Sequence, residues 1–200
     1  KIFVCSMADL FGAWVPDSWR EEVFKACDAA PWHTYMFLTK NPKRYCDLAN
    51  TGKLPKKKNF WYGTTLTTAK DLRFPGGRGG YNTFLSIEPI LEFFNAGIGS
   101  FGDDKWIIIG AETGKRKGKV IAERKWVENI VETAGLTHAA VFMKDSLEEI
   151  WGESLIQEWP EGMPADKGND VPHCKECERH KAAEEEIDMP TLFEFLDEVS

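Results

Sequence analysis

Short apolar runs that alternate with helical patterns are the feature that most restricts the fold of this sequence. The first 150 residues contain six such runs, at 2–6, 34–39, 60–65, 83–87, 106–110 and 139–143. Several lack polar alternation, as expected for strands that are covered on both faces. Helical apolar spacing fills three of the intervals, at 17–30, 42–49 and 122–134. This order predicts βα units around a parallel sheet, and six units predict a partial, open TIM-like α/β barrel.

Two further stretches of the sequence depart from the βα pattern. The connection 66–81 contains the run Phe-Pro-Gly-Gly-Arg-Gly-Gly, which predicts an irregular loop. After residue 143 the strand pattern stops, so we expect a barrel over 1–151 and an acidic appendage over 152–200. The appendage has one short amphipathic pattern after Pro190, with apolar residues at helical spacing (Leu192, Phe195, Leu196 and Val199).

The formal net charge of −7 comes from the appendage. Residues 151–200 hold 14 acidic and 4 basic side chains, which leaves 18 acidic and 21 basic residues in the first 150. The slightly basic barrel therefore remains compatible with nucleic-acid binding. No apolar stretch approaches the roughly 18 residues of a membrane span, and no signal-peptide pattern is present. We expect a cytoplasmic protein with reduced cysteines.

Polar residues follow the end of every apolar run. In barrels of βα units, the carboxyl ends of the strands surround one mouth where function gathers. We therefore expect a polar site that contains Lys40, Thr64, Glu88, Glu112 and Lys144. Such residues can hydrogen-bond a ribose or an amino-acid group, and burial can shift their pKa toward acid–base work. The alternative is that the glutamates and lysines pair with one another and stabilise the barrel without chemistry.

The loop after the fifth run is the most basic in the sequence. Gly110 and Gly114 enclose Ala-Glu-Thr, and Lys115, Arg116 and Lys117 follow directly. Glycines let a backbone approach an anion, and the cations would neutralise its charge. A phosphate or nucleic-acid contact and a solvated turn both fit this pattern.

Six segments in order resemble one family over about residues 1–151. They are KIFVCSMADLFG (1–12), FLTKNPKRY (37–45), NFWYGTT (59–65), FLSIEPIL (84–91), WIIIGAETG (106–114) and VFMKDSLEEIW (141–151). These segments resemble the phage-associated radical-SAM-like proteins of uncharacterised function, which are related in fold to spore photoproduct lyase. The resemblance implies a partial barrel that binds S-adenosylmethionine and a [4Fe–4S] cluster. By this resemblance, Ser86, Glu88, Gly110 to Gly114 and Lys144 align with the strand ends where cofactor and substrate should meet. We therefore predict cofactor contacts at Ser86, Glu88, Gly110, Glu112 and Gly114. From the resemblance together with the polar strand ends and the basic loop, we predict substrate contacts at Lys40, Thr64, Lys144, Lys115, Arg116 and Lys117.

The chain departs from the pattern of this family at the cluster. The family is expected to hold the cluster on three closely spaced cysteines upstream of the segment that matches Lys1, and this sequence contains no CxxxCxxC. We expect Cys5 inside a strand, and Cys27 and Cys46 on helices. The chain starts without methionine inside an apolar run, so we expect the cluster-binding piece upstream of it. The alternative is a relative without catalytic activity.

A cysteine pair in the appendage is a candidate metal site. Cys174 and Cys177 have the CxxC spacing that lets two thiolates bind one ion, and His180 lies one helical turn further on. A single CxxC is half of a usual zinc site, so free thiols in a charged segment are the alternative.

Two functions of different class follow from these observations. The first is a radical-SAM-type enzyme that acts on an unidentified substrate related to nucleic acid, with its cluster ligands outside this chain. The second is a binding module without catalytic activity, which would hold nucleic acid at the mouth or the basic loop and a protein partner through the acidic appendage.

Overall fold

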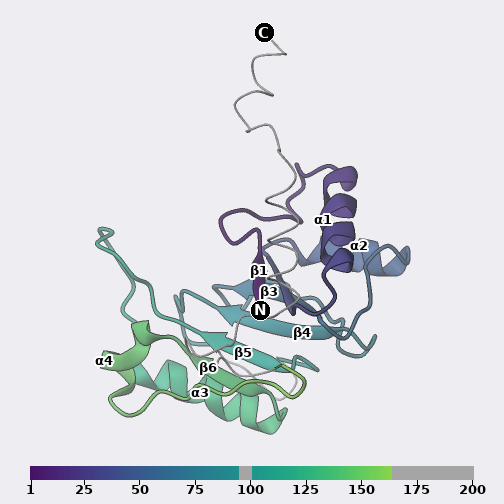
Figure 1. Cartoon of the computed structure of the whole chain (residues 1–200). Coiled ribbons are helices and arrows are strands. Elements are labelled where there is room, and N and C mark those ends of the chain that lie inside the picture. The colour runs from purple at the N-terminus through teal and green to yellow at the C-terminus, as the bar shows by residue number, and fades with distance from the viewer. Residues whose placement is uncertain (95–100, 164–200) are drawn as a thin grey trace, which may run out of the picture. The chain divides into compact units, whose positions relative to one another are not determined.

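The computed structural model describes residues 1–94 and 101–163, and Figure 1 shows the course of the chain. The chain divides into two compact units, Lys1–Pro164 and Ala165–Ser200, and everything below concerns the first. Among the described residues, no helix combines the length and apolar content that crossing a membrane requires.

One sheet of six parallel strands forms the centre of this unit (Figure 1). The strands are β1 (Ile2–Val4), β2 (Tyr35–Thr39), β3 (Phe60–Leu66), β4 (Asn82–Ile87), β5 (Trp106–Ile109) and β6 (Ala140–Met143). Each strand pairs with the next one in the chain, so the spatial order equals the sequence order and β1 and β6 form the two edges. The prediction of an α/β fold with six parallel strands is confirmed.

Three helices connect strands in the described part of the chain. They are α1 (Asp17–Ala29), α2 (Pro42–Asn50) and α3 (Arg124–Leu136). A 3-10 turn, η1 (Asp145–Leu147), and the short helix α4 (Glu148–Trp151) follow β6. The connection from β3 to β4 has no helix, as its glycine-rich sequence predicted.

The helices all cover the same face of the sheet. The register aligns Thr39, Thr64, Leu85, Ile107 and Val141 in one row across five strands, so these residues share a face. Leu85, Ile107 and Val141 pack in one apolar cluster with α3. Phe37 and Tyr62, each two residues before Thr39 and Thr64 and therefore on the same face, pack in a second cluster with α1 and α2. Each large apolar side chain buried there contributes about 1.5–3 kcal/mol, which holds the helices on the sheet.

The opposite face of the sheet is lined by aromatic side chains. Trp61, Phe84 and Trp106 are almost completely buried on this face, and the partly buried Trp159, from the segment after α4, packs against them. Gly63 makes this packing possible, because a Cβ atom there would lie 2.2 Å from the ring of Phe84. Glycine at this position therefore follows from the close approach of the neighbouring ring.

The segment that follows α4 continues the first unit. The backbone N–H of Met143 donates to the carbonyl of Ile156 at 2.7 Å, and that of Glu158 donates to the carbonyl of Val141 at 2.8 Å. An antiparallel bridge joins Phe142 and Gln157. This pairing covers the free edge of β6, which would otherwise expose unpaired backbone groups. The compact unit therefore extends to Pro164, beyond the predicted boundary at residue 151.

Candidate functional site

Three neighbouring strands bring Glu88, Gly110 and Lys144 together at their carboxyl ends. The Nζ atom of Lys144 donates a hydrogen bond to Oε2 of Glu88 at 2.6 Å. The pair is partly accessible, with 30% of the Glu88 side chain and 45% of the Lys144 side chain exposed. A Cβ atom at position 110 would lie 3.0 Å from Oε1 of Glu88, so the absence of a side chain at Gly110 allows the carboxylate to occupy this position. We call these three residues the mouth triad.

Backbone hydrogen bonds fix the positions of the triad. The N–H of Gly110 donates to the carbonyl of Ile87 at 3.1 Å, and the N–H of Lys144 donates to the carbonyl of Ile109 at 2.9 Å. Both bonds continue the sheet pairing one residue past the strand ends. The triad thus rests on rigid elements, which is the usual basis of a precise binding site.

Ser86 and Thr65 lie beside the triad on the face away from the helices. Ser86 precedes Glu88 by two residues on the same side of β4 and is 4% exposed. Thr65 pairs in register with Ser86 from β3 and is partly exposed. Sequence reasoning predicted Ser86 but missed Thr65. Trp61, Gly63 and Thr65 are alternate residues of one strand and therefore share a face, and this alternation is the signal that could have identified Thr65.

Thr64, by contrast, faces the helices rather than the mouth. Its side chain is 1% exposed, and its Oγ1 atom accepts a hydrogen bond from the backbone N–H of Phe74 at 3.2 Å. The structure therefore does not bring Thr64 to the predicted mouth. Successive residues of a strand point to opposite faces, so a shift of one residue exchanges the two sides.

Glu112 binds its own loop. Its carboxylate accepts hydrogen bonds from Nε and Nη2 of Arg116 at 2.6 and 2.9 Å, and one from the backbone N–H of Val120 at 3.0 Å. These bonds lower the pKa of Glu112 to about 2, with the hydrogen bond from Arg116 as the largest cause. Glu112 and Arg116 are therefore mainly internal partners. Lys115 and Lys117 remain exposed on this loop, and Gly114 adopts a left-handed conformation with φ +84°.

Two pockets open at the carboxyl edge of the sheet. One, of about 510 Å³, lies at the ends of β2 and β3 and is lined by Lys40, Lys43, Thr65 and Lys70 among others. The other, of about 410 Å³, lies between the loop that carries Glu112 and the η1–α4 segment. Both volumes fall within the range of small-ligand sites. Lys43 and Lys70 were not predicted, because one lies on a helix and the other in an irregular loop.

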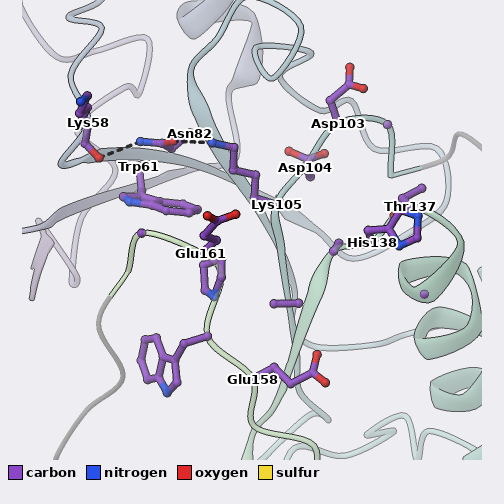
Figure 2. A pocket seen from close by; sticks show the side chains of 17 residues that line it. Lys58, Trp61, Asn82, Asp103, Asp104, Lys105, Thr137, His138, Glu158 and Glu161 are labelled. Atoms are coloured by element: carbon purple, nitrogen blue, oxygen red, sulfur yellow. Dashed lines mark hydrogen bonds between the residues drawn. The ribbon is translucent and has the colours of Figure 1, made fainter.

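A further pocket, of about 1020 Å³, lies at the opposite, amino edge of the strands (Figure 2). Here Nζ of Lys105 donates to Oδ1 of Asn82 at 2.8 Å, while Nδ2 of Asn82 donates to the carbonyl of Lys58 at 2.9 Å. Asp104 is 3% exposed and pairs with Arg73 at 3.4 Å. Burial raises the pKa of Asp104 to about 6, against the lowering effects of Thr83 and Arg73. These groups bind one another, which is typical of a structural edge.

The described cysteines do not fit an iron–sulfur cluster. Cys5 lies in a turn after β1 with φ 53° instead of inside a strand, while Cys27 and Cys46 lie on α1 and α2 as predicted. Burial raises the pKa of Cys27 to about 11, which disfavours the thiolate that metals require. Within 1–94 and 101–163, no three His, Cys, Asp or Glu residues are grouped to hold a metal ion. The predicted zinc ligands Cys174, Cys177 and His180 lie outside the described residues.

Comparison with known proteins supplies a family for this chain. No curated protein and no solved structure matches it. Residues 1–189 match the family DUF5131, which is described as a protein of unknown function. Because the match extends over most of the sequence, the chain belongs to the DUF5131 family.

Proposed function

We propose that this chain is the S-adenosylmethionine-binding part of a radical-SAM-type enzyme, built on a partial TIM-like barrel and acting on a substrate related to nucleic acid. The observation that carries this proposal is the Glu88–Lys144 ion pair beside Gly110, at the carboxyl edge of a parallel sheet. Ligands bind at that edge in α/β sheets and barrels, because the connecting loops gather there.

Contacts between the two ends of the sheet support the partial barrel. The ammonium group of Lys1, just before β1, lies 3.7 Å from the ring centroid of Trp159, which follows β6. Met36 of β2 belongs to the same buried cluster as Met163, near the end of the described chain. The β1–β2 side of the sheet and the segment after β6 thus share packing on the face away from the helices, as expected for a sheet that curves towards closure.

The charges of the triad support an amino-acid ligand. The methionine moiety of S-adenosylmethionine carries one ammonium and one carboxylate, and the triad offers one carboxylate and one ammonium. Glu88 can accept hydrogen bonds from the ligand's ammonium group, and Lys144 can donate to its carboxylate. The pair is exposed enough to exchange its internal bond for both contacts.

A pocket near the triad supports the rest of the ligand. Its lining includes Ala111 and Asp145, which directly follow Gly110 and Lys144, and its volume of about 410 Å³ is of a size to take part of a nucleoside. S-adenosylmethionine supplies an electrophilic sulfonium group when bound. Because the described cysteines do not fit a cluster, we assign to this chain the binding of S-adenosylmethionine and not its reductive cleavage.

Calorimetric titration with S-adenosylmethionine tests the proposal. Glu88→Gln and Lys144→Gln each remove one charged contact, and we expect each to weaken binding by about tenfold. Glu123→Gln and Lys125→Gln are matched controls, because Nζ of Lys125 pairs with Glu123 at 2.7 Å on the exposed start of α3. The proposal is supported if the two control variants bind S-adenosylmethionine as tightly as the original chain while the two site variants bind it more weakly. No binding by the original chain, or equal losses in all four variants, contradicts it.

The second candidate is a nucleic-acid-binding module without catalytic activity. The exposed Lys115 and Lys117 on the loop after β5 favour it, since phosphate binding depends on accessible cations. Arg116 contributes less than predicted, because it is bound to Glu112. Salt-dependent DNA binding together with no affinity for S-adenosylmethionine would favour this candidate. Residues 164–200, the larger part of the appendage predicted to bind a protein partner, lie outside the described residues.

A further inference from the structure

The pocket at the ends of β2 and β3 is strongly cationic. Its lining includes the ammonium-bearing side chains of Lys40, Lys43 and Lys70, all of which are exposed. No described residue forms an ion pair with any of these three lysines. Three cations around one pocket of about 510 Å³, with no carboxylate partner in the described ranges, repel one another, so the pocket is favourable for an anion.

The acidic groups nearby are already bound to the backbone. Among the described residues that line the pocket, Asp71 is the one carboxylate, and its Oδ2 accepts hydrogen bonds from the N–H groups of Thr67 and Thr68 at 2.6 and 2.8 Å. Although burial alone would raise its pKa, these bonds lower it. Asp9, just outside the pocket, accepts from Thr39 and from the backbone N–H of Lys40. Neither carboxylate forms an ion pair with the lysines.

Two further donors point to the same ligand chemistry. Thr65 lines the pocket and is partly exposed, and its hydroxyl can donate to an anion. The amino end of α2 also lines it, and Asn41 forms no side-chain capping bond there. The first turn of a nine-residue helix therefore adds its partial positive charge to that of the lysines.

The pocket lies next to the mouth triad. Leu66 ends β3 and pairs in register with Ile87, which ends β4. Thr67 of the pocket and Glu88 of the triad directly follow these two paired residues. Adjacent strands are about 4.8 Å apart. A group bound between the lysines therefore lies within a few strand spacings of the proposed S-adenosylmethionine site.

We propose that this lysine pocket binds a phosphate group of the substrate and holds the substrate beside Glu88. This inference rests on the proposed function in placing the substrate at the same mouth, and it names the substrate class as a phosphate ester. Both a free nucleotide and a nucleic-acid backbone carry this group. Phosphate oxygens accept several charge-assisted hydrogen bonds at once, which matches three ammonium groups, one hydroxyl and the end of a helix.

Two titrations without S-adenosylmethionine test the inference and distinguish the sources. In the first, inorganic phosphate, adenosine monophosphate and a single-stranded oligonucleotide are added separately to the ¹⁵N-labelled chain, and the amide resonances of Lys43 and Thr65 are followed. In the second, the affinity for a fluorescent single-stranded oligonucleotide is measured at several salt concentrations. The variant Lys43→Gln/Lys70→Gln removes two cations of the pocket. The control Lys25→Gln/Lys58→Gln removes the same charge elsewhere, from α1 and from the amino edge.

We expect the pocket variant to bind the oligonucleotide about tenfold more weakly and to reduce the slope of log K against log salt by about 1.4, while the control changes much less. Shifts with the small phosphates identify a nucleotide-sized ligand, and shifts with the oligonucleotide alone identify a nucleic-acid backbone. Both outcomes support the pocket. No shift at Lys43 and Thr65 with any probe, or equal losses in pocket variant and control, overturns it. Failure here leaves the calorimetric result for S-adenosylmethionine unaffected, so the two proposals fail separately.

Discussion

The ammonium group of Lys144 lies 2.6 Å from the carboxylate of Glu88, although 56 residues separate the two in the sequence. Glu88 directly follows β4 and Lys144 directly follows β6, and β5 lies between these strands with Gly110 directly after it. Any side chain larger than hydrogen at position 110 would meet Glu88. The pair therefore depends on three strands at once.

The ion pair itself should contribute little to stability. Both side chains are partly exposed, and exposed pairs contribute about 0–1 kcal/mol. We expect Glu88→Gln and Lys144→Gln to change the free energy of unfolding in urea by less than about 1 kcal/mol. A loss of several kcal/mol would instead indicate that the pair is a structural element of the sheet.

Gly110→Ala should disturb the mouth more than the fold. The new Cβ would lie 3.0 Å from Oε1 of Glu88, so the glutamate must move by a few tenths of an ångström. We expect a loss of about 1 kcal/mol in unfolding free energy and weaker binding of S-adenosylmethionine. Gly135→Ala is the control, since nothing lies within 4 Å of a Cβ there and alanine favours the helix α3. Equal binding by the two variants would contradict a role for Gly110 at the site.

Thr64 and Thr65 should respond differently to the same substitution. Thr64→Val removes the acceptor for the buried N–H of Phe74, so we expect a loss of about 1–3 kcal/mol in unfolding free energy and little direct effect on phosphate binding. Thr65→Val should leave stability within about 0.5 kcal/mol and weaken phosphate binding. Urea unfolding and the phosphate titration measure both effects. The reverse pattern would show that the assignment of the two faces is wrong.

Asp104 should make stability fall as the pH rises. Its pKa is about 6 in the folded chain against 3.8 as the ordinary value, so the folded state binds more protons between these two values. Linkage then makes the unfolding free energy decrease from about pH 4 to pH 6, by up to about 3 kcal/mol from this group alone. Asp104→Asn removes the titrating group and should flatten the curve over this interval. An unchanged slope in the variant would show that other groups cause the dependence.

Much of the fold could be predicted from short-range patterns. Six apolar runs predicted the six strands, and 3.6-residue spacing predicted α1, α2 and α3, because burial on both sides of a parallel sheet requires continuous apolar residues. The strand predicted at 2–6 ends earlier, at Val4, because the chain turns at Cys5. No local sequence pattern indicates this turn. The packing of 152–163 along β6 also had no signal in the sequence, as these contacts are specific to this tertiary arrangement.

The candidate site divides in the same way. By itself, the sequence determined that polar residues end the strands and that Glu88, Gly110 and Lys144 are among them, because parallel strands must share one carboxyl edge. Only the tertiary structure decided that Thr64 faces the helices, since a one-residue register difference exchanges the faces of a strand. The tertiary structure also decided that Glu112 binds Arg116 and that Lys43 and Lys70 line the same pocket. Contacts between loops depend on the whole fold, and no periodic pattern in the sequence encodes them.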